Sequence, residues 1–172
     1  LGNPPWIKVE WNSGDVLGDY EPRFVIRRQT APQLAWLREE TFERIPALKQ
    51  GWTDEFEESE GTQNFLSGHV NYPELRAVQT NLYKCFLPRA WDNVSEKGVS
   101  GFLHPEGVYD DPKGGNFRRE LYPRLRGHYQ YVNELNLFAE VDHHAKFSAN
   151  VYGPFSSELH FHHLANLFVP QT

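Results

Sequence analysis

The tetrapeptide Asn3-Pro4-Pro5-Trp6 carries groups suited to chemistry on a planar amino group. Two consecutive prolines fix two φ angles and remove two backbone N–H donors, so carbonyl oxygens in this segment are left as acceptors. Asn3 adds a side-chain carbonyl, and Trp6 offers a flat aromatic face. The tetrapeptide is therefore a rigid set of acceptors beside a stacking surface, which fits a planar group bearing an NH2. An ordinary proline turn is the alternative that these four residues leave open.

The tetrapeptide and four segments downstream of it each resemble a motif of one enzyme family. The Asn-Pro-Pro-aromatic sequence resembles motif IV of the amino-methyltransferases that use S-adenosylmethionine. Segment 81–87 is similar to the motif V helix of DNA adenine methyltransferases, and 98–105 to the strand that follows it. Segments 136–138 and 147–152 resemble the motif VIII region and the last strand. Because several motifs occur in the family's order, the resemblance extends from residue 1 to about residue 153.

The resemblance implies an α/β fold, namely the C-terminal part of a class I S-adenosylmethionine-dependent methyltransferase domain of the Rossmann-like type. Residues 1–153 would form the C-terminal half of the catalytic domain, with a partly helical insertion at about 7–72. Residues 154–172 would begin the segment that leads to the next domain. Segment 104–152 is most similar to the methylases of large type II restriction–modification systems.

The activity implied is site-specific methylation of double-stranded DNA in a restriction–modification or phage-defence system, by a cytoplasmic protein of prokaryotic type. Asn3 and the Pro4 carbonyl would accept the two hydrogens of the exocyclic amino group of a flipped adenine. Trp6 would stack on that base, and Phe138 would flank its other side. No metal and no covalent intermediate are needed for this chemistry.

Two further residues match the family's cofactor positions. Leu82 and Phe86 correspond to the motif V side chains that line the adenine pocket of S-adenosylmethionine, although a plain core role would explain them equally well. Two alternative functions also stay open. One is an amino-methyltransferase acting on protein glutamine or RNA guanine, and the other is a non-catalytic binding or scaffold segment.

The start of the chain predicts a fragment. The chain opens at Leu1 and contains no methionine, and the family's glycine-rich cofactor loop and ribose-binding acidic residue have no counterpart in its 172 residues. We therefore expect a piece of a longer protein that is inactive in isolation. A processed or trimmed chain is the alternative.

The amino-acid composition excludes several classes of protein and of site. The mean hydropathy of -0.65 and the lack of any long apolar run predict no membrane span. A single cysteine, Cys85, fits a reducing compartment. The formal charge of -6 argues against the segment being a nucleic-acid grip by itself. The clustered histidines at 143–144 and 160–163 lack the cysteine or carboxylate spacing of a metal site, so we predict none.

Hydrophobic spacing predicts the elements that would position these residues. We expect helices over 31–49 and 72–91, the second with an apolar stripe and a kink or end at Pro88. A third helix follows an Asn116 cap, and the acidic run 54–60 forms a solvated loop or helix face. Strands are expected over 99–103 and 147–152, and a strand or a strand pair over 129–138, with a turn-rich loop over 104–115. The strand order of the family that the chain resembles implies three strands here, with an open edge.

Overall fold

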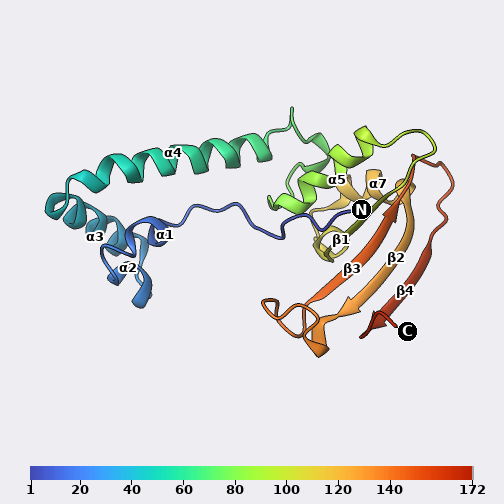
Figure 1. Ribbon diagram of the computed structural model, residues 1–172. Helices are drawn as coiled ribbons and strands as arrows, with labels where there is room; N and C mark the ends of the chain where they lie inside the picture. The colour runs from blue at the N-terminus through green and yellow to red at the C-terminus, as the bar shows by residue number, and fades with distance from the viewer. Residues whose placement is uncertain (172) are drawn as a thin grey trace. The chain divides into compact units, whose positions relative to one another are not determined.

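The computed structural model describes residues 1–171, which divide into two compact units. We call residues 9–65 the helical unit. We call residues 1–8 together with the rest of the chain from residue 66 onward the sheet unit. Figure 1 shows the helices of the first and the strands of the second. The sheet unit contains every residue predicted above to form the site.

The sheet unit is built on four strands in the order β1-β3-β2-β4. β3 runs antiparallel to both of its neighbours, so β1 and β2 are parallel to each other, and β4 is parallel to β2. The chain start lies beside β1, because Gly2 forms a parallel bridge with Phe102. The chain therefore has an α/β fold with a mixed sheet. The strands span Ser100–Pro105 (β1), Leu125–Val132 (β2), Lys146–Tyr152 (β3) and His162–Leu167 (β4).

Short helices cover one face of this sheet. Their apolar side chains join those of the strands in one buried cluster, which includes Leu87 from α5, Phe117 from α7 and Tyr152 from β3. The helices of the sheet unit are η1 (Pro73–Leu75), α5 (Leu82–Asn93), α6 (Gly107–Asp110), α7 (Gly115–Leu121), η2 (Tyr122–Arg124) and η3 (Asn133–Leu135), of which η3 is the turn that follows β2.

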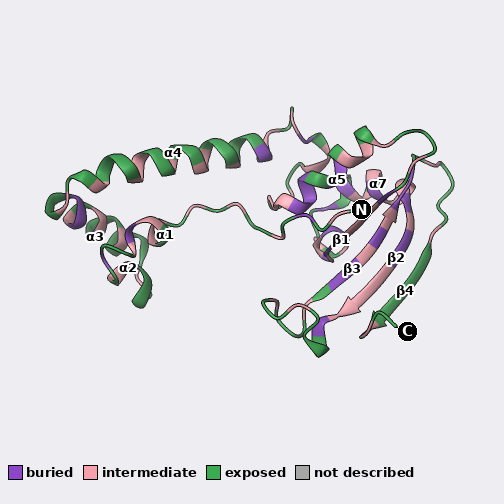
Figure 2. Ribbon diagram, viewed as in Figure 1, coloured by how far each residue is buried: buried purple, intermediate pink, exposed green. Residues whose placement is uncertain are grey.

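The two faces of the sheet differ in burial. On the covered face, Ser148, Asn150 and Tyr152 of β3 are buried, and they alternate with the half-buried Ala149 and Val151 of the opposite face. Figure 2 shows that the edge strand β4 is mostly exposed. The sheet therefore has one covered face and one largely open face.

The helical unit consists of four helices around a small apolar core. Leu17, Phe24, Leu37 and Phe42 are its buried residues, and Trp52 packs against them. The helices are α1 (Ser13–Leu17), α2 (Arg23–Ile26), α3 (Ala31–Arg44) and α4 (Ala47–Ser67). The unit lies within the segment 7–72 that the sequence analysis assigns to an insertion.

Several predicted helices have different bounds. The predicted 31–49 helix ends at Arg44, and Pro46 separates it from α4, which contains the acidic run as an exposed helix face. The predicted 72–91 helix is wrong before residue 82, because Ala77 has a left-handed φ of 67° and only a short 3-10 turn precedes it. α7 is capped by Gly114, one residue before its first position, and not by Asn116.

The strand predictions need two corrections. Strand 129–138 is displaced: β2 begins at Leu125 and ends at Val132, and a 3-10 turn follows. The sheet has a fourth strand, β4, where three were expected, because this edge strand is exposed from its first residue to Asn166 and shows no alternation of buried and exposed positions. The predictions over 99–103 and 147–152 are confirmed, and the predicted 104–115 loop contains the end of β1 and α6.

Candidate functional site

The structure brings Trp6 and Phe138 into contact from opposite ends of the chain. Their ring centroids are 5.1 Å apart with an interplanar angle of 54°. Phe147 of β3 completes the group, at 5.9 Å from Trp6 and 5.0 Å from Phe138. The Trp6 indole Nε1 donates a hydrogen bond of 3.4 Å to the Leu103 carbonyl of β1. The two predicted base-stacking residues therefore share one aromatic cluster with the buried Phe147, and Trp6 also packs against the main core of the sheet unit.

Asn133 fixes the loop that carries Phe138. Its side chain is fully buried, and its Oδ1 accepts a hydrogen bond of 2.9 Å from the Phe138 backbone N–H. Its Nδ2 donates to the carbonyls of Phe138 and Val141 at 2.9 Å each. One side chain thus organises the turn by pairing with both polar groups of the Phe138 backbone. The sequence analysis missed Asn133, because a polar residue inside a predicted strand gives no sign of a loop anchor.

Asn3 and Pro4 lie beside the same strand. The backbone of Gly2 forms two hydrogen bonds with β1, to the Gly101 carbonyl and from the Leu103 N–H, which fix the start of the tetrapeptide. Asn3 is exposed and Pro4 is buried. Within residues 1–171, the Asn3 side chain and the Pro4 carbonyl form no hydrogen bond. Both predicted acceptors are therefore without a hydrogen-bond partner in the described chain, and Asn3 is the exposed one.

An apolar hollow of about 570 Å³ adjoins Asn3 on the open face. Its volume falls within the range of small-molecule sites, which is roughly 300–1,000 Å³. Asn3 is a polar side chain in an otherwise mostly apolar lining, to which Leu1, Leu103, Tyr129, Ala149 and Val151 contribute.

Leu82 and Phe86 occupy the outer side of α5. The core-facing residues of this helix are Tyr83 and Leu87, whereas Phe86 is 47% exposed and Leu82 is half-buried. The predicted apolar stripe through Leu82 and Phe86 therefore does not face the core. A hydrogen bond of 2.9 Å from the Leu82 N–H to the Ile7 carbonyl ties the start of α5 to the end of the tetrapeptide segment.

A buried acceptor lies next to Leu82. The Asn81 side chain caps no backbone N–H of α5, and its Oδ1 is buried without a hydrogen-bond partner in the described chain. A buried acceptor without a donor costs about 1–3 kcal/mol, so such an atom marks a place where a ligand donor would be stabilising. Asn81 belongs to the motif V segment, but the sequence alone gave it no role.

A buried polar network lies under the opposite face of the sheet. Burial lowers the pKa of His104 to about 4, so this imidazole is neutral. Its Nδ1 donates to the Pro105 carbonyl, which can only accept, and its Nε2 therefore accepts from the Tyr152 hydroxyl at 2.8 Å. This fixed tautomer links β1 to β3 across the sheet.

Glu106 anchors the second half of this network. Burial acts to raise the pKa of its carboxyl, but hydrogen bonds from His128, Ser148 and Gln130 outweigh it and lower the pKa. His128 Nε2 donates to Glu106 at 3.1 Å, and His128 Nδ1 lies 2.9 Å from Nδ1 of His163 on β4. The network joins β1, β2, β3 and β4, and contains none of the predicted site residues.

The described residues contain no cluster of three metal-ligating side chains. His128 and His163 approach each other, while His143 packs against His144, with ring centroids 3.8 Å apart. The Cys85 thiol is buried, and this burial raises its pKa to about 11.

Comparison with protein-family models and with curated proteins gives no match to this chain. Among the described helices, none is both long and apolar enough to cross a membrane.

Proposed function

We propose that this chain is the C-terminal half of the catalytic domain of a DNA adenine methyltransferase. In this proposal a methyl group passes from S-adenosylmethionine to the exocyclic amino nitrogen of an extrahelical adenine. The observation that carries it is the contact between Trp6 and Phe138, together with an Asn3 side chain, three residues before Trp6, that has no hydrogen-bond partner in residues 1–171. A plain proline turn requires neither the aromatic contact nor the unpartnered acceptor.

The strand arrangement supports the same proposal. Class I methyltransferase sheets end with one reversed strand between two strands that are parallel to each other. β3 has this place between β1 and β2. The tetrapeptide follows directly after the Gly2 bridge to β1, where a preceding parallel strand of such a sheet would end.

The chemistry follows from the acceptors. The nitrogen of an adenine amino group is a poor nucleophile while its lone pair is delocalised into the ring. Asn3 Oδ1 and the Pro4 carbonyl, each accepting one of its hydrogens, favour a more tetrahedral nitrogen with a localised lone pair. Trp6 would hold the base outside the duplex, where the nitrogen is accessible. When bound, S-adenosylmethionine supplies an electrophilic methyl group.

The residues of α5 fit one side of that cofactor. Leu82 and the 47% exposed Phe86 offer apolar surface that the protein core does not use. Asn81 Oδ1 is a buried acceptor that an adenine amino group could satisfy. These three residues would therefore bind the adenine end of S-adenosylmethionine.

Methyl transfer in the natural full-length protein tests the proposal. Tritiated S-adenosylmethionine and duplex DNA should yield N6-methyladenine after digestion of the DNA. Asn3→Ala should lower the single-turnover rate by roughly 10²–10³-fold, because it removes one preorganised acceptor. DNA affinity should change little, since phosphate contacts dominate it.

Asn116→Ala, at an exposed position of α7, is the matched control and should keep the wild-type rate. A wild-type rate in Asn3→Ala would contradict the proposal. Label recovered in protein glutamine or RNA guanine would assign the activity to one of the alternative substrates instead.

A further inference from the structure

Arg27 and Arg28 are unusual among the arginines of the helical unit. Arg23 and Arg44 pair with Glu21, and Arg38 pairs with Glu39. The side chains of Arg27 and Arg28 form no ion pair or hydrogen bond with any residue in 1–171, and both are exposed. The unit as a whole is acidic, with twelve Asp and Glu against six Lys and Arg. Two adjacent unpaired cations are therefore exceptional on this surface.

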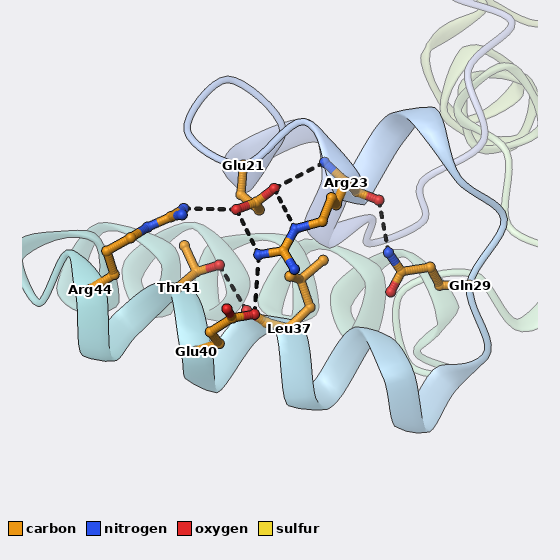
Figure 3. Close-up of polar contacts among 7 residues, drawn as sticks. All are labelled: Glu21, Arg23, Gln29, Leu37, Glu40, Thr41 and Arg44. Carbon is orange, nitrogen blue, oxygen red and sulfur yellow. Dashed lines mark hydrogen bonds and ion pairs between the residues drawn. The ribbon is translucent and has the colours of Figure 1, made fainter.

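The buried carboxylate of Glu21 pairs with Arg23, so Arg23 is not free to bind a ligand together with Arg27 and Arg28. Glu21 accepts hydrogen bonds from Arg23 Nε at 2.8 Å and from Arg44 at 2.8 Å, and Arg23 also reaches Glu40 at 3.1 Å (Figure 3). Glu21 is 6% exposed, so its charge is largely used within this cluster. The cluster joins α3 to the start of α2.

The segment that carries the two arginines is held at both ends. Gln29 Nε2 donates to the Arg23 carbonyl at 3.0 Å, which folds the connector back on α2 (Figure 3). Thr30 caps α3, and its N–H donates to Gln33 Oε1 at 2.8 Å in a capping box. Arg27 and Arg28 thus extend from a fixed backbone, which lowers the entropy lost when they bind a ligand.

A hollow of about 390 Å³ lies beside this segment. Arg23, Arg27, Arg28, Gln29, Gln33, Trp36 and Leu37 line it. Trp36 is 64% exposed and adds an aromatic face to the two guanidinium groups. Planar guanidinium groups match phosphate oxygens in a bidentate manner, and the face of an exposed tryptophan can pack on the adjacent deoxyribose.

We propose that this hollow binds the sugar–phosphate backbone of DNA, with Arg27 and Arg28 on phosphates and Trp36 against the neighbouring nucleoside. The inference rests on the proposed function, because it gives the helical unit the same substrate as the sheet unit. A duplex presents a narrow row of phosphates that can reach two arginines within an acidic surface. An extended anionic membrane would place its charge against the acidic residues as well.

Fluorescence anisotropy with a labelled DNA duplex and the full-length protein tests this contact. Arg27→Ala/Arg28→Ala should reduce the salt dependence of binding, lowering the slope of log K against log[salt] by about 2. Affinity at about 0.1 M salt should fall roughly tenfold or more. Trp36→Ala should weaken binding several-fold, and Trp36→Phe should restore most of it.

Lys97→Ala/Arg119→Ala is the matched control, because it removes the same charge from exposed positions of the sheet unit. Its salt slope should stay close to wild type, and unchanged circular dichroism should show that each variant folds. An unchanged slope in the Arg27 and Arg28 variant overturns the inference.

Binding of phosphatidylserine vesicles that needs these arginines, with no effect on DNA, also overturns it. The vesicle measurement is required because two apolar side chains, Val25 and Ile26, are exposed next to Arg27 and Arg28. Methyl transfer measured in parallel separates the two proposals. Its absence from the wild-type protein counts against the proposed function, whereas the salt slope alone decides the inference.

Discussion

The two units of this chain differ in how many polar side chains they bury and in their formal charge. Among the described residues, the sheet unit buries eight polar or charged side chains, and the helical unit buries two, Glu21 and Thr41. The unit with fewer buried polar side chains has the larger formal charge. The sheet unit is balanced, with eleven acidic and eleven basic residues, whereas the helical unit has twelve against six. The sheet unit therefore buries several polar groups in its core, whereas the helical unit buries only two and has the larger excess of acidic residues.

This difference shows how each unit obtains a defined structure. Buried polar groups must be hydrogen-bonded, so the contacts of His104 with Tyr152 and of Glu106 with His128 favour one register of β1, β2 and β3. The helical unit depends instead on a few apolar side chains and on the ion cluster at Glu21. The sheet unit can therefore hold side chains for chemistry in fixed positions, whereas the helical unit provides surface.

The largest expected effect tests whether the two units are separable. Leu37 is 2% exposed in the small core of the helical unit, so Leu37→Ala should cost about 2–5 kcal/mol through lost burial and a cavity. Hydrogen exchange followed by mass spectrometry should show faster exchange in α3 and unchanged protection in β1 and β3.

Leu121→Ala is the reciprocal variant, because Leu121 is fully buried in the sheet unit. It should expose β1 and β3 to exchange and leave α3 protected. Equal loss of protection in both units for either variant would contradict the comparison.

The next largest effect is expected at Asn133, a buried polar side chain of the sheet unit. Asn133→Ala removes the anchor of the Phe138 loop and leaves buried backbone groups without partners, which should cost about 1–3 kcal/mol. Urea denaturation should show the loss, and near-ultraviolet circular dichroism should report altered packing of Trp6 and Phe138. Asn136→Gly is the control, because Asn136 is exposed with a φ of 52° that glycine adopts easily. Equal stability of both variants would refute the anchoring role.

The sequence predicted an element well where a local alternation fixes its type. Strand 147–152 was predicted correctly, because the alternation of Phe147, Ala149 and Val151 with polar residues is typical of a strand. The alternation did not show which face is covered, because the polar residues Ser148 and Asn150 lie on the covered face. The 72–91 helix failed because apolar spacing continues through 75–78, while the left-handed φ of Ala77 breaks the backbone. Periodicity cannot report a backbone angle that tertiary contacts impose.

The site was predictable in part for a related reason. The tetrapeptide indicated Asn3 and Trp6 directly, since rigid acceptors beside an aromatic ring form a local pattern. The roles of Asn133 and Asn81 could not be predicted, because each depends on burial at a loop or helix end that only the folded chain defines. Tertiary packing also decides which face of α5 meets the core, and in the structure Phe86 lies on the exposed face.

A pH titration tests the ion cluster of the helical unit. The hydrogen bond from Arg23, followed by that from Arg44, lowers the pKa of Glu21 from 4.5 to about 2. A carboxyl with a lowered pKa stabilises the folded state fully above the unfolded value near 4.5, and this stabilisation is lost as the pH falls through about 2. The difference in melting temperature between wild type and Glu21→Gln should therefore be constant above pH 4.5 and shrink below it. Glu43→Gln, at an exposed position of α3, should show no such trend, and a constant difference for Glu21→Gln would rule out the cluster's role.

The smallest effect is expected on the exposed acidic face of α4. Asp54, Glu57 and Glu58 are exposed, and the two glutamates lie three and four positions after Asp54, so like charges face one another along the helix. Glu58→Lys replaces one repulsion with an Asp54 pair at i,i+4, which should add about 0.2–0.5 kcal/mol to the local stability of α4 at low salt. Hydrogen exchange in α4 should report this gain, and it should fade at high salt because exposed charges are screened. Glu134→Lys, on an exposed turn of the charge-balanced sheet unit, should give no comparable gain. A similar gain at both positions would mean that the excess acidity of the helical unit has no energetic consequence of its own.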